Sequence, residues 1–316
     1  AAPAAGAMSA PSMAKMGSKP NMEQMKDFLN SGIKMMESDA TREILKDPNV
    51  RPGPKLVELQ RANWDTLGID QDIGCEALNE LAPSDAETTE AFEIKHKFVY
   101  TAMRTFLRAL EDRRPSVLEK SKPMPREVIL EFFNACNTRL DLPETSEFLL
   151  DHFAKTPDRE KRGDAIAEMQ RQALEVLGWE RTHGCALLEK IPQDFAGDQE
   201  VLGMLQHWYM KAKQTFVMVE QIIIQRQFKE EMAGSDDMRK AAELVDAMSP
   251  QERGQVIEKM QKKVQVLVGL PMEARQDHLK KQSPEDRMEL LKGLVIAFRV
   301  MQQQASAMHE KQDAAS

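Results

Sequence analysis

Two Gly-Cys pairs are the residues of this sequence whose type and spacing most suggest chemistry. Gly74-Cys75 lies in LGIDQDIGCEALNEL, and Gly184-Cys185 lies 110 residues further along in LGWERTHGCALLEKI. A reactive or metal-binding thiol needs a pKa that is lowered by a helix N-terminus or a nearby cation. His183 precedes the second pair, but Ile73 stands before the first. Because no basic partner is shared, we interpret both pairs as packing residues that let a neighbouring helix approach closely.

The remaining candidates for chemistry form no recognisable constellation. Cys136 makes the cysteine count odd, and without a C-x-x-C pair the three thiols predict neither a disulfide framework nor a zinc site. No H-E-x-x-H, G-x-S-x-G, G-x-G-x-x-G or phosphate-binding loop is present. We therefore predict a protein that is not an enzyme and has no catalytic, cofactor-binding or metal-binding residues. The six histidines are expected at surfaces or helix edges: His96, His152, His183, His207, His278 and His309.

Composition and charge favour an all-α protein that binds other proteins. The chain has 316 residues, of which 41% are hydrophobic but only 5% aromatic, and 21 are Met, a mixture that suits helices better than sheets. A net charge of −8 argues against a nucleic-acid backbone or an anionic membrane surface as the main partner. No run reaches the roughly 18 apolar residues of a membrane-spanning helix.

The sequence similarity between the two Gly-Cys segments belongs to a longer internal repeat. Aligned without gaps, the stretch from Leu59 to Leu110 shares 12 identities in 52 positions with the stretch that starts at Met169. DFLNSG from Asp27 likewise resembles EFFNAC from Glu131. The sequence therefore predicts two tandem copies of a multi-helix unit of about 105 residues, followed by a small C-terminal helical bundle.

Helix signals indicate which elements hold the Gly-Cys pairs. Gly68 and Gly178 each follow an amphipathic helix, as glycine commonly does after the last helical residue. Asp70 is expected to cap the short helix that carries the first pair. Ser84 is expected to cap the long helix that follows, with Asp194 in the same role in the second copy. In the second long helix, Leu202, Trp208, Tyr209, Ala212, Phe216 and Val219 are predicted to form the buried face.

Five segments are predicted along the chain. Near the C-terminus, Ser249-Pro250 and Ser283-Pro284 are typical helix starts. The predicted segments are a flexible tail rich in Ala, Pro, Ser and Met (1–20), a first helical unit (21–112), a second helical unit (125–232), a C-terminal bundle (235–306) and a polar tail (307–316).

The start of the chain is rich in methionine, which suggests either soft-metal binding or docking. The residues are Met8, Met13, Met16, Met22, Met25, Met35 and Met36. Thioether sulfur can hold Cu(I), but copper sites normally use more such motifs with His or Cys nearby. Since Met also packs against many shapes, we expect the N-terminal tail to dock on a partner.

One stretch resembles a known family. MMESDATREILKDPNV, from Met35 to Val50, is similar to the aspartate-proline helices of Hop-type co-chaperones, in which Met-rich helices end in Asp-Pro and form a client groove. The likeness implies an apolar groove and client binding. It covers these 16 residues, the family's second Asp-Pro helix is missing, and the second copy has Thr156-Pro157 in place of Asp47-Pro48. We assign the chain to no family on this basis.

The expected function is that of a non-catalytic helical adaptor, a structural subunit that ties other protein subunits into a larger assembly. The opening AAPAAGAMSAPSMAKMGSKP is of the kind left after removal of a targeting segment, or is a low-complexity tail. We expect the protein in an organelle, at the soluble flank of a membrane complex. A plastid photosystem is preferred to a mitochondrial complex, and a cytoplasmic location remains an alternative. The alternatives are a co-chaperone and an enzyme, which needs convergent polar groups that the sequence does not reveal.

Overall fold

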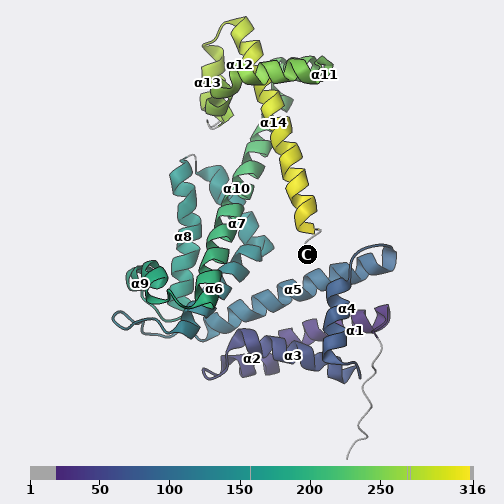
Figure 1. Cartoon of the computed structure of the whole chain (residues 1–316), viewed down its shortest axis with the longest axis vertical. Coiled ribbons are helices and arrows are strands. Elements are labelled where there is room, and N and C mark those ends of the chain that lie inside the picture. Colours follow the sequence, from purple (N-terminus) through teal and green to yellow (C-terminus); the bar gives the residue numbers. More distant parts are fainter. Residues whose placement is uncertain (1–18, 157, 269, 271, 314–316) are drawn as a thin grey trace, which may run out of the picture. The chain divides into compact units, whose positions relative to one another are not determined.

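The chain is built of α-helices (Figure 1). The computed structural model describes residues 19–156, 158–268, 270 and 272–313. These residues contain fourteen helices and no β-strand, and Glu119 and Trp179 form an isolated β-bridge. The predicted all-α class is therefore confirmed.

The helices follow one another with short connections, and their bounds fall into three groups along the chain. The first five are α1 (Met22–Glu37), α2 (Asp39–Lys46), α3 (Pro52–Thr66), α4 (Gln71–Glu80) and α5 (Ala86–Asp112). The next five are α6 (Arg126–Asp141), α7 (Pro143–Lys155), α8 (Arg159–Val176), α9 (Arg181–Asp194) and α10 (Gln199–Gly234). The last four are α11 (Asp236–Ala247), α12 (Pro250–Val268), α13 (Met272–Lys280) and α14 (Pro284–Asp313).

The order of helices α1–α5 recurs in α6–α10. Each set has two helices, a third that ends before a glycine, a short helix with a Gly-Cys pair, and a long helix. The helices α1 and α6 both have 16 residues. This order is what a duplicated unit produces, and the duplication itself stays a prediction.

Contacts divide the chain into two compact units. One contains the described residues up to Leu142 together with Gln170–Met204, and the other contains Pro143–Met169 and the residues from Leu205 onward. The division passes through α8 and α10, so the first unit holds helices from both parts of the predicted repeat, whereas the second unit holds helices of the second part and the C-terminal helices. The predicted segment boundaries remain predictions from sequence.

The core of the first unit forms around α1, α3 and α5. Buried residues of α1 recur every three or four positions, which turns one face of the helix toward the core. There Phe28 stacks on the fully buried Trp64 of α3, with ring centroids 3.7 Å apart and planes within 4° of parallel. Phe98 of α5 lies 5.6 Å from Phe28, so three helices meet at this aromatic cluster.

The second unit has two apolar clusters. One joins α7, α8 and α10 through Leu149, Phe153, Ala165, Val219 and Ile223. The other joins α11, α12 and α14 through residues that include Val245, Val264, Leu294 and Phe298.

A buried arginine closes one end of α12 in this second cluster. Arg275 is fully buried and donates hydrogen bonds to the carbonyls of Leu267 and Leu270. The Leu267 carbonyl lies in the last turn of α12, the negative end of the helix dipole, where a cation is stabilised, and Leu270 follows just after the helix. Its guanidinium also lies 5.6 Å from the ring centre of Phe298.

Some predicted helix starts are confirmed, and two are wrong. Pro250 and Pro284 begin α12 and α14 as predicted. The cap of α5 is Asp85, whose carboxylate accepts from the Thr88 amide, and not Ser84. Asp194 is the last residue of α9 and caps nothing.

The same shift occurs at the start of α10, where the Asp198 carboxylate accepts from the Val201 amide. In both places an aspartate one to four residues later marks where the helix begins, because its carboxylate bonds a free amide of the first turn.

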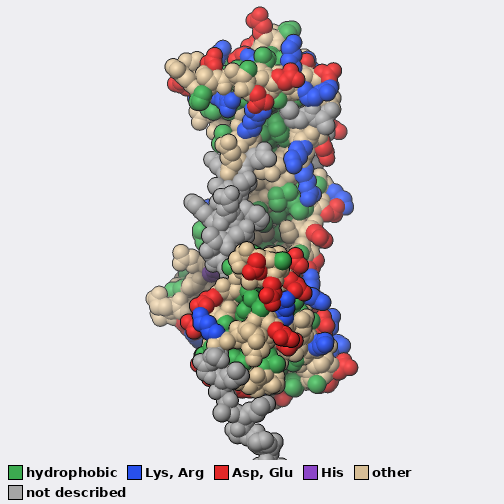
Figure 2. Space-filling model, turned by 90° about the vertical axis from the view of Figure 1, so that its right-hand side faces the viewer, with side chains coloured by type: hydrophobic (Ala, Val, Ile, Leu, Met, Phe, Trp, Pro, Cys, Tyr) green, Lys and Arg blue, Asp and Glu red, His purple; other side chains and the backbone are tan. Residues whose placement is uncertain are grey.

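Charged side chains of both signs cover much of the surface. On the face that Figure 2 shows, acidic side chains gather over the part formed by the first five helices, with basic ones among them. Residues 1–18 of the predicted tail, with Met8, Met13 and Met16, lie outside the described residues. At the other end α14 continues to Asp313, beyond the predicted start of the polar tail.

Candidate functional site

The glycines in front of the Gly-Cys helices adopt the backbone conformation that the sequence predicts. Gly68 has φ of 70° and Gly178 has φ of 93°, a left-handed region that favours glycine. The carboxylate of Asp70 accepts from the amides of Asp72 and Ile73 and so caps α4, as predicted. Glu180 caps α9 by accepting from the His183 amide. Both turns therefore aim a short helix back across the helix that precedes it.

The Gly-Cys glycines lie directly against that preceding helix. A Cβ atom added at Gly74 would lie 2.5 Å from Cδ2 of Trp64, and one added at Gly184 would lie 2.9 Å from both methyl groups of Leu174. Real Cβ atoms essentially never approach other heavy atoms under 3.0 Å. The close approach that we predicted for these glycines is thus present in both places.

The cysteine environments favour packing over thiol chemistry. Cys136 is buried, and burial raises the pKa of its thiol to about 12. Burial also raises the pKa of Cys185, which is partly exposed. A raised pKa keeps the thiol protonated at neutral pH, and the thiolate is the nucleophile and metal ligand. Cys75 packs at the edge of the first unit's core.

Three of the six histidines lie against aromatic rings, each in a different place. His183 stacks on Trp179, with its Nε2 2.8 Å from the Lys122 carbonyl oxygen. His96 lies beside Phe92, and His152 lies beside Phe148. Over the described residues, no group of three His, Cys, Asp or Glu side chains is placed to hold a metal ion.

The methionines at the start of the described chain are core residues. Met25 and Met36 are buried, and Met22 and Met35 pack against the same core at its edge. The segment that resembles an aspartate-proline helix forms the end of α1, the short helix α2 and the turn after it. Met36 belongs to the buried core, and the client groove that the resemblance implies stays a prediction.

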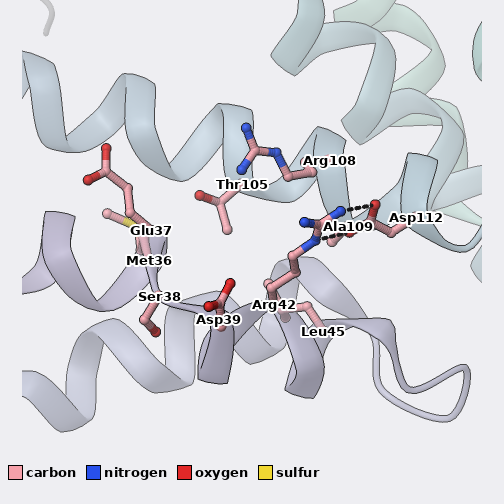
Figure 3. A pocket seen from close by; sticks show the side chains of 10 residues that line it. All are labelled: Met36, Glu37, Ser38, Asp39, Arg42, Leu45, Thr105, Arg108, Ala109 and Asp112. Atoms are coloured by element: carbon pink, nitrogen blue, oxygen red, sulfur yellow. Dashed lines mark hydrogen bonds and ion pairs between the residues drawn. The ribbon is translucent and has the colours of Figure 1, made fainter.

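That same segment instead borders a polar hollow. The hollow lies between the end of α1, α2 and α5 (Figure 3), and it is lined by Met36, Glu37, Ser38, Asp39, Arg42, Leu45, Thr105, Arg108, Ala109 and Asp112. Sequence reasoning missed this grouping, because the lining residues come from positions about 70 apart and follow no motif.

The chemistry of the hollow is that of a structural ion pair. Arg42 donates from Nε and Nη2 to the two carboxylate oxygens of Asp112, at 2.7 and 2.9 Å. This contact lowers the pKa of Asp112 and raises the pKa of Arg42, so both groups keep their charges. The room inside is about 60 Å³, enough for a few water molecules. Pockets for small ligands measure roughly 300–1,000 Å³, so the hollow is too small for a typical substrate.

The described residues offer a more promising surface on α10 of the second unit. Its exposed positions from residue 206 to 218 lie along one side of the helix, which we call the α10 face: Gln206, His207, Tyr209, Met210, Lys213, Gln214, Val217 and Met218. The exposed fractions are 60% for Tyr209, 46% for Met210 and 41% for Met218. Lys213 carries the one full charge among these eight side chains.

The opposite side of α10 explains why this face is exposed. Phe216, Val219 and Ile223 pack against α7 and α8, so the core contacts of the helix are made on the other side. Tyr209 was predicted to belong to the buried face, and that assignment is wrong. The sequence signal was ambiguous because apolar residues occur on both sides of the helix, which leaves the hydrophobic period of 3.6 weak.

Exposed apolar side chains with little charge are typical of protein interfaces. The buried centre of such interfaces is depleted in Lys, Glu and Asp and enriched in Tyr and Met. None of the described helices combines the length and apolar composition needed to cross a membrane. The α10 face thus has the kind of composition that is common at the centre of protein interfaces.

Comparisons with known proteins place the chain in no family. No protein-family model matches it, and neither a curated protein nor a solved structure is similar to it. Its function is therefore inferred from its own residues.

Proposed function

We propose that this protein is a non-catalytic helical adaptor, a structural subunit that binds other proteins in a larger assembly. The observation that carries the proposal is the α10 face, where Tyr209, Met210 and Met218 are each at least 41% exposed. Raised thiol pKa values and the small volume of the polar hollow support a role without catalysis.

The partner that fits the α10 face is a helix or loop with its own apolar residues. Met210 and Val217 are seven positions apart, which places them two turns from each other on one line along the helix. Amide side chains of Gln206 and Gln214 lie beside this line. An apolar centre whose polar neighbours are uncharged apart from Lys213 suits a partner with the same pattern, because few charges are then buried on binding.

The test combines a disruptive variant with a matched control. Met210→Gln with Val217→Gln removes apolar contact from the face, whereas Ile257→Gln with Val266→Gln makes the same kind of change at exposed positions of α12. We expect the first variant to lose a stoichiometric partner on purification from the native source and the control to keep it. Both variants should retain helix content and stability, since all four side chains are at least 37% exposed. Equal partner recovery by both variants would rule out the α10 face as the interface.

The assembly that we propose is a membrane complex of an organelle, with this chain at its periphery. We favour a plastid photosystem over a mitochondrial complex. The support is the composition of the tail, rich in small residues and free of acids. The tail is also proposed to contact a partner. Fractionation of the native source, followed by identification of the proteins that co-purify, tests both statements. Recovery of the protein alone in a cytosolic fraction would contradict them.

A further inference from the structure

The segment between α5 and α6, which we call the seated segment (residues 115–123), packs against the turn at Gly178 that precedes α9. The Glu119 amide donates to the Gly178 carbonyl at 2.7 Å, and the Glu180 amide donates to the Glu119 carbonyl at 3.0 Å. Pro115 lies against Gly178, so close that a Cβ there would be 2.9 Å from its Cγ. These two backbone bonds and one ring contact hold an extended segment across the turn, as in strand addition to an exposed backbone edge.

The same segment then makes a tight turn of its own. The Glu119 carboxylate accepts from the amides of Lys120, Ser121 and Lys122 and from the Ser121 hydroxyl. These hydrogen bonds lower the pKa of Glu119 to about 2. Glu119 thus pairs with the Gly178 turn through its backbone and closes the following turn through its side chain. Both contacts come just before α6, which begins at Arg126.

The matching turn before α4 has the same backbone but no such segment among the described residues. Gly68 adopts positive φ, and Asp70 caps α4 in the way that Glu180 caps α9. No described residue donates to the Gly68 carbonyl or accepts from the Asp70 amide in the manner of Glu119. No described atom would lie within 4 Å of a Cβ at Gly68, where Pro115 covers Gly178.

The N-terminal tail contains a second version of the seated segment. Pro11-Ser12 and Ser18-Lys19-Pro20 recur as Pro115-Ser116 and Ser121-Lys122-Pro123, with one additional residue between the two parts in the tail. The helices that follow also correspond, since α1 begins two residues after Pro20 and α6 begins three residues after Pro123.

We propose that residues 11–20 of this chain bind across its own Gly68–Asp70 turn. Lys15 takes the place of Glu119, so that its amide donates to the Gly68 carbonyl and its carbonyl accepts from the Asp70 amide. Residues 1–10 then remain as the part of the tail for partner contact under the proposed function.

The described start of the chain brings the segment to the correct helix. Lys19 forms an ion pair with Glu80, the last residue of α4, at 2.6 Å. The ten residues of α4 span about 15 Å at 1.5 Å each, and residues 11–18 extend over roughly 26 Å at 3.3 Å each. The segment is thus long enough to run from Lys19 back to the turn at the other end of α4.

Charge also matches between segment and turn. The cap and first turn of α4 carry Asp70 and Asp72, where the cap and first turn of α9 have Glu180 and Thr182. The tail has Lys15 at the position that Glu119 occupies in the other segment. A lysine beside two carboxylates is favourable, and a glutamate there would be repelled.

Amide hydrogen exchange of Asp70, followed by NMR in the full chain, tests the proposal. We expect the Asp70 amide to be protected like that of Glu180. Lys15→Pro removes the N–H that bonds the Gly68 carbonyl and should speed exchange at Asp70 at least tenfold, with Glu180 unchanged. Lys15→Ala is the matched control and should keep the protection, because it retains the backbone N–H.

Two truncations provide an independent comparison. Removal of residues 1–10 should leave the Asp70 amide protected, whereas removal of residues 1–17 should expose it. An unprotected Asp70 amide in the full chain, or equal protection in both truncations, would overturn the proposal. Protection that rises with protein concentration would also overturn it, since the segment would then come from a second copy of the chain.

Discussion

Gly74→Ala should destabilise the first unit, because the added methyl group has no space. The Cβ would lie 2.5 Å from Cδ2 and 2.6 Å from Cε2 of Trp64. The ring cannot retreat, since Trp64 is fully buried and its other face stacks on Phe28 with centroids 3.7 Å apart. The strain must therefore be relieved by moving α4 or by opening the aromatic cluster.

The magnitude follows from two opposing effects. Overpacking of a close-packed core costs about 1–3 kcal/mol. Replacing glycine by alanine inside a helix returns about 1 kcal/mol, because alanine loses less backbone freedom on folding. We expect a net loss of about 0–2 kcal/mol in the free energy of unfolding, which makes the variant about 1–3 kcal/mol less stable than an unstrained Gly→Ala change would be. Gly184→Ala should cost less, because its neighbour is the flexible end of Leu174.

Urea unfolding monitored by circular dichroism at 222 nm measures the change. Gly163→Ala is the matched control, since Gly163 also lies inside a helix and nothing lies within 4 Å of its added Cβ. The control should be more stable than the unmodified protein by up to about 1 kcal/mol. A Gly74→Ala protein as stable as the Gly163→Ala control would refute the argument that Gly74 is present for close packing.

The cysteines and the segment before α6 give two further predictions. Cys75→Ala and Cys185→Ala should each lower stability by about 1 kcal/mol or less through lost packing and leave partner binding intact; loss of binding by a folded variant would restore a role for the thiols. The Glu119 carboxyl should titrate near pH 2 by NMR, below its ordinary 4.5, because its hydrogen bonds stabilise the charged form. Since the folded pKa is the lower one, its contribution to stability is present above about pH 4.5 and is lost as the pH falls toward 2. Glu119→Gln should abolish that part of the acid dependence, and a titration midpoint near 4.5 would contradict the observed contacts.

Local signals in the sequence were enough to predict the helical class and several helix ends. Gly68 and Gly178 end their helices in a left-handed conformation that few other residues adopt easily. Pro250 and Pro284 mark helix starts because proline needs no amide partner in the first turn. Asp85 displaced Ser84 as the cap of α5 since several acceptors compete near a helix start and sequence alone does not rank them.

The surfaces were decided by tertiary packing. Tyr209 looks like a core residue by spacing but is 60% exposed, because α10 turns Phe216 and Val219 toward α7 and α8. The hollow beside Arg42 needs Asp112, which lies 70 residues away on α5. No short pattern links such positions, since they meet only when separate helices pack.

The sequence by itself determined the type of secondary structure along the chain. It indicated that the chain is helical, that two helices end at glycines, and that the small Gly-Cys pairs lie where helices approach each other. These properties depend on backbone conformation and on neighbours a few residues away. What only the tertiary structure decided is which side of each helix faces a neighbour. That choice depends on apolar contacts between distant segments, such as Trp64 between Phe28 and Gly74, and so it fixed which residues were left exposed.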